Sequence, residues 1–296
     1  MAKIKKIFIT GATGFVGRSI VRAGKKEGYT FACLVRNLDR AKKILTSNSC
    51  TFIKGDITNI GSLKKVIEKN DAVINLVGII SETKKSSFDE IHFKGAKNLI
   101  DASKSSGIKK FIQMSALGAR KDGKTAYHIT KWKAEDYLQK SGLNYTIFKP
   151  SVIFGKDDKF INLFIKLLKL SPIFPALGKG TLEPVWVEDV ANSFINALNN
   201  PKSDRQIIEL GSGKVYTHTE LLKTLCQKLH IKRLIFPMPT PIAKTMALLS
   251  EMLLPSPLLT REQLIMLDEK NQVSNRNAET IFNISYKTLE DYLEEL

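Results

Sequence analysis

Three side chains in the middle of the chain have the types and the spacing for acid–base chemistry. Tyr127 and Lys131 lie four residues apart in the segment YHITK, so they share one face of a predicted helix. A nearby ammonium favours the phenolate, which lowers the pKa of the tyrosine and lets it exchange a proton with a carbonyl or an alcohol. Ser115, at the end of a predicted strand, could hydrogen-bond the oxygen of that substrate.

A glycine-rich turn near the start of the chain predicts a dinucleotide site. GATGFVG places Gly11, Gly14 and Gly17 three residues apart, between an apolar run and a segment with helical spacing. Gly11 permits the tight turn, Gly14 lets the backbone approach a pyrophosphate, and Gly17 lets the helix pack closely on the strand. The N–H groups that begin the helix then face the phosphates. A glycine-rich turn without a ligand is the alternative.

The end of the second apolar run indicates which dinucleotide. Arg36, with Arg40 one turn later, follows FACLV, where an NAD-preferring site would carry Asp or Glu. A carboxylate would repel a 2′-phosphate, whereas arginine can bind it with two parallel hydrogen bonds. We therefore predict NADP(H) rather than NAD(H). Asp56, in GDIT, could accept from the adenine amine or could cap a helix that begins near Asn59.

Elements that could hold these residues alternate along the first half of the chain. Amphipathic stretches of helix length lie between short apolar runs, which predicts a parallel sheet covered on both faces, a doubly wound α/β fold of the Rossmann type. Residues 1–150 would form the dinucleotide-binding domain. The strands are expected at 6–10, 31–35, 51–55, 72–78, 110–115 and 145–150, and the helices at 14–27, 59–69, 87–106 and 127–141.

The second half has a looser pattern. Residues 151–296 are expected to form a smaller, mostly helical lobe for substrate or partner, interleaved with the main sheet, with a cleft between the lobes. Two apolar helices flanked by proline, FINLFIKLLKL and PIAKTMALLSEMLLPSPLL, could form a lid or core, or could dock onto a membrane or a membrane-bound partner. Strands are expected at 182–187 and 206–211, and helices at 157–170, 188–199, 218–229 with Thr217 as N-cap, 241–254, 260–268 and 286–295.

In their order along the chain, these motifs resemble those of the short-chain dehydrogenase/reductase superfamily, in its extended or atypical NAD(P)H-binding branch. The resemblance rests on GATGFVG, Arg36, GDIT, NLVG, MSALGA and YHITK. Later segments, KPSVIFG, PVWVEDVA, YTHTELL and PSPLLTREQL, are similar to those of the accessory subunits of respiratory complex I and their bacterial relatives. The similarity covers nearly the whole chain.

The resemblance implies a role for each matching position. Tyr127, Lys131 and Ser115 would be the catalytic residues, and Lys131 would also hold the nicotinamide ribose. The cofactor-binding residues would be Gly11, Thr13, Gly14, Phe15, Val16 and Gly17 at the pyrophosphate, Arg36 at the 2′-phosphate, Asp56 and Ile57 at the adenine, Val77 and Gly78 along the adenine ribose, and Pro150, Ser151 and Val152 near the nicotinamide.

One departure from the superfamily leaves the activity open. Only 12 positions separate Ser115 from Tyr127, whereas clearly catalytic extended members carry a longer insert there. One function is an NADP(H)-dependent oxidoreductase on a carbonyl or alcohol, with a lipid- or quinone-related substrate. The other is a non-catalytic, NADPH-holding accessory or assembly protein of a membrane redox complex, with Tyr127 only beginning a helix and Lys131 only binding ribose. A weaker alternative, an NAD-dependent sugar-nucleotide epimerase or dehydratase, is disfavoured by Arg36.

Composition and charge limit the classes of partner that the protein is expected to bind. The net charge is +17, and the whole excess lies in residues 1–150, where it could attract a phosphorylated cofactor or an anionic membrane, or could simply be solvated. The lysines are scattered without a compact basic-aromatic patch, so no nucleic-acid partner is expected. No stretch reaches the roughly 20 apolar residues of a spanning helix, and the cysteines and histidines lack metal-ligand spacing. We expect a cytoplasmic protein without a metal, which could lie at the inner face of a membrane.

Overall fold

Seven parallel strands form the central sheet, which confirms the predicted doubly wound fold. The computed structural model describes residues 3–46, 48–59, 61, 63–83, 86–253 and 259–295. The strand order is β11-β6-β5-β4-β1-β2-β3, and all six pairings between neighbours are parallel. The strands are β1 (Lys6–Thr10), β2 (Thr30–Val35), β3 (Cys50–Lys54), β4 (Ala72–Asn75), β5 (Lys110–Met114), β6 (Tyr145–Pro150) and β11 (Gln206–Leu210).

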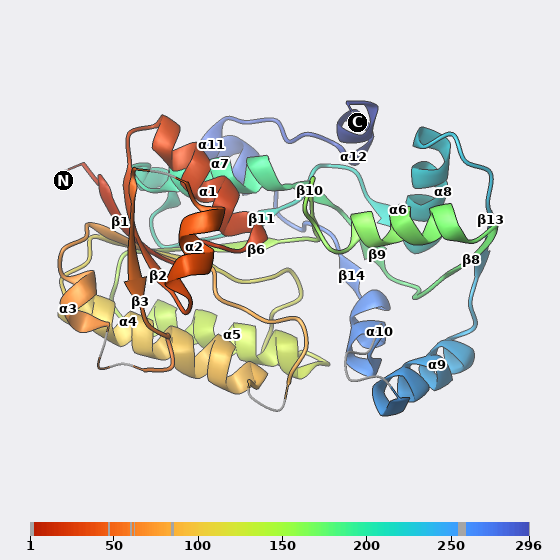
Figure 1. The fold of residues 1–296 in the computed structure, drawn as a ribbon, viewed down its shortest axis with the longest axis horizontal. Helices are drawn as coiled ribbons and strands as arrows, with labels where there is room; N and C mark the ends of the chain where they lie inside the picture. Colours follow the sequence, from red (N-terminus) through yellow and green to blue (C-terminus); the bar gives the residue numbers. More distant parts are fainter. Residues whose placement is uncertain are drawn as a thin grey trace. The chain divides into compact units, whose positions relative to one another are not determined.

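Helices cover both faces of this sheet (Figure 1). One face carries α1 (Phe15–Lys26), α7 (Val187–Ala197) and α11 (Asn277–Phe282), and the other carries α3 (Lys64–Ile67), α4 (Gly95–Ser105) and α5 (Ala126–Lys140). A π-helical turn, Asp89–Lys94, leads into α4, and the short α2 (Leu38–Ile44) follows β2. Because neither face of the sheet is left in water, its strands are continuous apolar runs rather than alternating ones.

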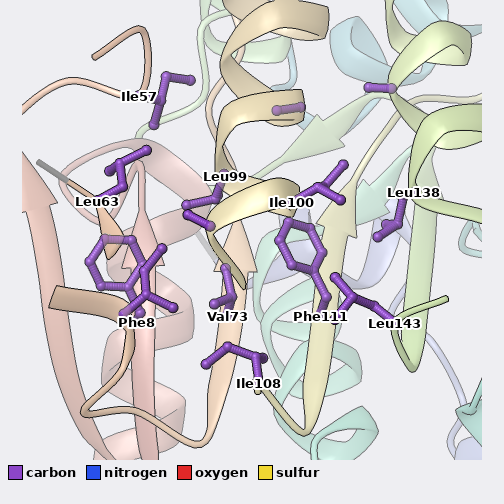
Figure 2. Packing of buried hydrophobic residues seen from close by; sticks show 14 of the residues in the cluster. Phe8, Ile57, Leu63, Val73, Leu99, Ile100, Ile108, Phe111, Leu138 and Leu143 are labelled. Atoms are coloured by element: carbon purple, nitrogen blue, oxygen red, sulfur yellow. The ribbon is translucent and has the colours of Figure 1, made fainter. Parts of the chain in front are cut away.

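One hydrophobic core lies between the sheet and the helices α3, α4 and α5. Phe8, Val73 and Phe111, from three neighbouring strands, pack with side chains of these helices. Figure 2 shows this packing, including Leu99 and Leu138. On the opposite face, the ring of Phe148 lies 4.4 Å from that of Phe194 in α7 and 5.9 Å from that of Phe282 in α11. The strands are thus fixed from both sides, which holds their ends in place.

The chain divides into two compact units. The first comprises Met1–Pro150, Val187–Leu210 and Asn275–Ile284, and the second comprises Ser151–Trp186, Gly211–Ser274 and Ser285–Leu296. Within the second unit, α6, α8 and α12 surround a separate core that includes Phe154, Leu225 and Leu289. Its elements are β7 (Ile153–Phe154), α6 (Ile161–Leu170), β8 (Ile173–Ala176), β9 (Thr181–Leu182), β10 (Val185–Trp186), β12 (Tyr216–Thr217), α8 (His218–Lys228), β13 (Leu234–Pro237), α9 (Thr240–Leu253), α10 (Arg261–Leu267), β14 (Lys270–Asn271) and α12 (Leu289–Glu294).

The single strand expected at 182–187 is wrong. The segment contains two short strands with different neighbours: β9 pairs with β12 and β14, and β10 pairs with β7. Glu183, between them, is fully buried, and its carboxylate accepts from the backbone N–H groups of Gly213 at 2.8 Å and Val273 at 2.9 Å. Pro184 follows and has no N–H to donate to a ladder.

Other differences between the expected and the observed secondary structure concern short helices and strands. The helix expected at 59–69 is only Lys64–Ile67 among the described residues, and Ile60 and Ser62 lie outside them. The sequence analysis missed α2, α11, β8 and β13, which have four to seven residues each. The N-cap expected at Thr217 is confirmed, because its hydroxyl accepts from the N–H of Glu220 at 3.2 Å.

A carboxylate at the amino end of the sheet is expected to contribute to stability. Asp71 accepts from the N–H groups of Lys5 at 3.0 Å and Lys6 at 2.9 Å, and from the ammonium of Lys109 at 2.7 Å. Burial raises the pKa of Asp71, but these hydrogen bonds lower it further, to about 2. The depressed pKa stabilises the fold above the unfolded pKa of about 4, and this contribution is lost as the pH falls towards 2.

We therefore expect Asp71→Asn to lower the free energy of unfolding at pH 7 by about 2 kcal/mol. Urea denaturation at pH 7 and near pH 3 measures this, and the two proteins should differ less at the lower pH. Asp122→Asn is the control, because that side chain is 89% exposed. An equal decrease in the free energy of unfolding of Asp71→Asn and Asp122→Asn would contradict the stabilising role of Asp71.

Candidate functional site

The carboxyl ends of the parallel strands bring most of the predicted site residues to one edge of the sheet. Gly11 follows β1, Arg36 follows β2, Val77 comes shortly after β4, and Ser115 follows β5. The strand order reverses between β1 and β4, since β2 and β3 lie on one side of β1 while β4, β5 and β6 lie on the other. In open α/β sheets, ligands bind at such a reversal point.

The glycine turn has the geometry that a pyrophosphate requires. Gly11 has a φ of +77°, and the N–H of Gly14 donates to its carbonyl at 3.0 Å. A Cβ added at Gly17 would lie 2.3 Å from the Gly11 oxygen, so only glycine lets α1 approach the turn this closely. Gly14 is exposed and directly precedes α1. The N–H groups of the first helical turn, which includes Phe15 and Val16, lack intrahelical partners and can meet phosphate oxygens.

A buried polar ladder that the sequence analysis missed lies beneath this turn. The Thr10 hydroxyl donates to Asn75 Oδ1 at 2.6 Å, and Asn75 Nδ2 donates to Gln113 Oε1 at 2.9 Å. These three residues end or nearly end β1, β4 and β5, and each is at most 2% exposed. The N–H of Val77 also donates to Asn75 Oδ1, at 3.3 Å. The ladder therefore joins the ends of three neighbouring strands and fixes the start of the loop that follows β4.

The two charged residues that were predicted to bind the adenosine part of the cofactor differ in their contacts. Arg36 is exposed directly after β2, and Asn37 caps α2 by accepting from the N–H of Arg40 at 2.9 Å. Asp56 accepts from the N–H and the hydroxyl of Thr58 at 3.0 and 2.9 Å. Asp56 thus caps its own turn, and the helix expected to begin near Asn59 falls on a segment that includes Ile60 and Ser62, which lie outside the described residues. Ile57 is 3% exposed and packs in the core, and its carbonyl accepts from Asn98 Nδ2 at 3.0 Å.

Lys131 reaches this edge from the inner face of α5. Its side chain is 3% exposed, and its Nζ donates to the Met114 carbonyl at 3.4 Å. A Cβ added at Gly78 would lie 2.9 Å from the same Nζ, so the glycine leaves room for the ammonium. Burial lowers the pKa of Lys131 to about 8, while the nearby carboxylate of Glu135 raises it.

Tyr127 lies in α5, one helical turn before Lys131, and is surrounded by aromatic rings. The rings of Phe88, His92 and His128 approach it edge-on at 5.8, 5.2 and 5.4 Å between centroids. The sequence analysis predicts a lowered pKa for this phenol. The prediction is wrong for this arrangement, because burial raises the pKa of Tyr127 to about 12. A buried phenol with a raised pKa keeps its proton at neutral pH.

Ser115 is tied to a side chain that the sequence analysis did not consider. Its hydroxyl donates to the carboxylate of Glu135, which is 2% exposed. The other carboxylate oxygen accepts from Lys149 Nζ at 3.3 Å, and Lys149 also donates to the Ala119 carbonyl at 2.7 Å. The short loop after β5 is thereby tied to β6 and α5. Glu135 follows Lys131 by four residues, and this spacing was a signal that could have identified it.

His92 connects the loop after β4 to α5. Its Nε2 accepts from the N–H of Ile79 at 3.0 Å, and its Nδ1 lies 3.1 Å from the hydroxyl of Thr130, which donates to the Ala126 carbonyl. The Ile79 carbonyl oxygen also lies 3.0 Å from Nε2, so these contacts fit either neutral tautomer. Burial and then the charge of Lys131 lower the pKa of His92 to about 3, so the ring is neutral at pH 7. No local sequence pattern marked this contact.

The three residues expected near the nicotinamide belong to different units. Pro150 ends β6 in the first unit, whereas Ser151 and Val152 begin the second. Within that second unit, the Ser151 hydroxyl donates to the Asn271 carbonyl at 3.0 Å, and the Val152 carbonyl accepts from the N–H of Val185 at 2.9 Å.

The glycine turn, the strand edge and the residues along it match a known family. A sequence model described as NAD(P)H-binding matches residues 11–201. The chain belongs to this NAD(P)H-binding family. The match covers the whole edge from Gly11 to Pro150, so a nicotinamide dinucleotide is its cofactor class.

Proteins that are similar to this chain have names that indicate several different functions. The chain is 30% identical to NADH dehydrogenase [ubiquinone] 1 alpha subcomplex subunit 9 of Arabidopsis thaliana, over 81% of this chain and 61% of that one. It is 29% identical to a photosystem II assembly factor of Cyanophora paradoxa (75% and 68% covered) and 26% identical to a ceramide reductase of Caulobacter vibrioides (79% and 74%). The chain thus spans about three fifths of the length of the complex I subunits that it matches.

Solved structures with the same fold include an epimerase from Methanothermobacter thermautotrophicus, with a TM-score of 0.74 and 18% identity over 99% of this chain and 90% of that one. This similarity supports the Rossmann fold. Across the part of the chain that the structure describes, no helix has the length and apolar character needed to cross a membrane.

Proposed function

We propose that this protein holds NADP(H) at the carboxyl edge of its sheet and serves as an accessory or assembly protein of a membrane-bound redox complex. The contact between Ser115 and Glu135 carries the proposal. A hydroxyl that donates to a buried carboxylate is held by a charge-assisted hydrogen bond, which must break before the serine can serve a substrate oxygen. The raised pKa of Tyr127 acts in the same direction. The complex I subunits among the similar proteins support this class of partner.

The cofactor fits the residues of the edge. The turn at Gly11, Gly14 and Gly17 would take the pyrophosphate, with the backbone of Thr13, Phe15 and Val16 around it. Arg36 would take the 2′-phosphate, Asp56 and Ile57 would border the adenine, Val77 and Gly78 would border its ribose, and Lys131 would hold the nicotinamide ribose. Pro150 and Val152 would border the nicotinamide, which supplies or accepts a hydride when the cofactor is bound.

An apolar helix face in the second unit supports a partner. In α9, Ile242, Met246, Leu249 and Leu253 follow the spacing of one helical stripe and are 49–74% exposed. The same helix buries the small residues Ala243 and Ala247. A helix that buries alanine and exposes leucine has its larger apolar side chains available for another surface. We propose a subunit of the membrane complex as the occupant of this stripe.

Two measurements test the proposal. Protein purified without added nucleotide is denatured, and the released small molecules are identified by mass spectrometry. Stoichiometric NADPH or NADP⁺ is expected, whereas an empty protein that exchanges NADPH freely would favour an ordinary enzyme. Affinity purification from the native membrane should recover subunits of a redox complex, and Leu249→Lys should reduce that recovery. Binding to protein-free anionic vesicles instead would identify a lipid surface as the occupant.

The second candidate is an NADP(H)-dependent reductase or dehydrogenase acting on a carbonyl or alcohol. Its support is the shared helix face of Tyr127 and Lys131, together with the similarity to a ceramide reductase. Tyr127 would exchange the proton, Lys131 would tune it and bind ribose, and Ser115, released from Glu135, would bind the substrate oxygen. A lipid- or quinone-related substrate would suit this candidate. The epimerase alternative remains disfavoured by Arg36, since a carboxylate at that position would suit NAD.

Tyr127→Phe separates the two functions. Under the accessory function, the variant retains NADPH with an unchanged Kd and rescues complex assembly in cells that lack the protein. Under the reductase function, turnover of a carbonyl substrate falls by at least about 100-fold while NADPH binding persists. NADPH oxidation with a panel of long-chain ketones and quinones measures the second outcome, and the retained cofactor serves as the control for folding.

A further inference from the structure

A buried carboxylate beside the site has no task in the proposed cofactor contacts. Glu135 lies in α5, four residues after Lys131 and eight after Tyr127, so the three side chains follow one face of the helix. Glu135 is 2% exposed and Lys131 is 3% exposed. A charged side chain is rarely buried this far unless it is paired and hydrogen-bonded. The contacts of Glu135 should therefore indicate what it does.

These contacts come from two neighbouring strands. The Ser115 hydroxyl, after β5, donates to one carboxylate oxygen, and Lys149 Nζ, from β6, donates to the other at 3.3 Å. Lys149 is fixed in turn by the Ala119 carbonyl at 2.7 Å. The preceding backbone carbonyl, that of Met114, accepts from Lys131 Nζ at 3.4 Å. One carboxylate is thus paired with Lys149 and held in place by a hydroxyl, on the helix face that also carries Lys131.

Glu135 is the neighbouring charge that favours the protonated form of Lys131. On the side of the π-helical turn, His92 is neutral at pH 7 and provides no negative charge. On the side of β6, Lys149 is a second positive charge. Burial lowers the pKa of Lys131 to about 8, and the charge of Glu135 is the influence that raises it. Among the described residues, the carboxylate of Glu135 is thus the charge that opposes the loss of the Lys131 proton.

We propose that Glu135 is a positioning residue that keeps the Lys131 ammonium charged and directed at the cofactor edge, with Lys149 and Ser115 holding the carboxylate in place. The inference rests on the proposed function, since a cofactor ribose is the ligand that Lys131 would bind. Glu135 touches neither cofactor nor substrate and acts through Lys131. The pH range of tight NADPH binding follows from the protonation of that one lysine.

The test is a pH titration of the cofactor-free protein. The Cε signal of Lys131 is followed by NMR in protein with ¹³C-labelled lysine, and Lys131→Arg assigns it. Glu135→Gln keeps the shape and the hydrogen-bonding oxygen but removes the charge. We expect it to lower the pKa of Lys131 by about 1 pH unit or more. Asp136→Asn is the matched control on the same helix, because its partner is the exposed Lys140, and it should leave the titration of Lys131 unchanged.

An unchanged titration in Glu135→Gln, or an equal shift in Asp136→Asn, overturns the inference. If Glu135→Gln does not fold, Lys149→Gln decides instead. Removing the competing ammonium leaves the carboxylate to Lys131 and should raise its pKa, whereas a fall or no change overturns the inference. NADPH binding, measured by fluorescence between about pH 6 and 10, is a separate readout. A wild-type protein that binds no NADPH would refute the proposed function, while the NMR titration would still decide the role of Glu135.

Discussion

Gly17→Ala is expected to abolish tight NADPH binding and to destabilise the fold, although the same exchange usually stabilises a helix. Alanine is favoured over glycine in helix interiors by about 1 kcal/mol. At Gly17 the added Cβ would lie 2.3 Å from the Gly11 carbonyl oxygen and 2.7 Å from the Ala12 Cα. Both are backbone atoms, so a rotamer change cannot relieve the clash. Either α1 moves away from β1 or the turn at Gly11 opens.

Both movements damage the dinucleotide site. The turn places the Gly14 N–H and the start of α1 where they can face a pyrophosphate, and hydrogen bonds to charged groups are worth about 1.5–3 kcal/mol each. Losing two of them weakens NADPH binding by at least about 100-fold. The overpacking itself costs about 1–3 kcal/mol of stability. Fluorescence titration with NADPH and urea denaturation measure the two effects separately.

Gly95→Ala is the matched control for this variant. Gly95 is also helical and buried, and its added Cβ would lie 2.5 Å from the end of the Ile57 side chain. The clash involves side-chain atoms rather than backbone, so a shift of the Ile57 side chain can relieve it without moving the chain. We expect Gly95→Ala to change stability by less than Gly17→Ala and to leave the pyrophosphate turn intact. If the two variants lose NADPH affinity equally, the close approach at Gly17 is not what the site requires.

The central sheet could be predicted from the sequence because each of its strands is marked by a local pattern. Each central strand is an apolar run bounded by polar residues, and the glycine turn sits between a strand and a helix, so β1, α1 and the parallel order could be expected. Short elements such as β13, Leu234–Pro237, could not. Its four residues form a strand only through pairing with β8, more than fifty residues earlier. The strand expected at 182–187 failed for a related reason, since Glu183 is buried by hydrogen bonds from distant loops.

The positions of the site residues could be predicted from the sequence. Their hydrogen-bond partners and pKa shifts were less predictable. Residues that follow strand ends, such as Arg36 and Ser115, could be expected at one edge because parallel strands align their carboxyl ends. The state of each group depends on burial and on partners far along the chain. Glu135 binds the hydroxyl that was expected to face a substrate, and the aromatic rings around Tyr127 raise the pKa that was expected to fall. These effects come from packing between α5, β5 and the π-helical turn, which no local pattern encodes.

Arg36→Asp is expected to reverse the preference between the two nicotinamide dinucleotides. Arg36 is exposed at the end of β2, at the position where the two cofactors differ by a 2′-phosphate. A guanidinium can bind that phosphate with two charge-assisted hydrogen bonds. Their loss, together with the repulsion from a carboxylate, should weaken NADPH binding by about 100-fold. The new carboxylate can accept from the 2′-hydroxyl of NADH, so NADH binding should be retained or improve.

The decisive quantity is the ratio of the two dissociation constants, because a general loss of positive charge would weaken both cofactors. Lys43→Asp is the matched control: it is exposed on α2, close in sequence to Arg36, and makes the same change in net charge. Long-range attraction between the basic first half of the chain and an anionic ligand would be reduced similarly in both variants, and added salt would screen it. A contact with the 2′-phosphate is instead lost only in Arg36→Asp, and its loss changes the ratio at every salt concentration. If both variants weaken NADPH and NADH alike, Arg36 contributes only to the general field, and the NADP(H) preference must be assigned elsewhere along the edge.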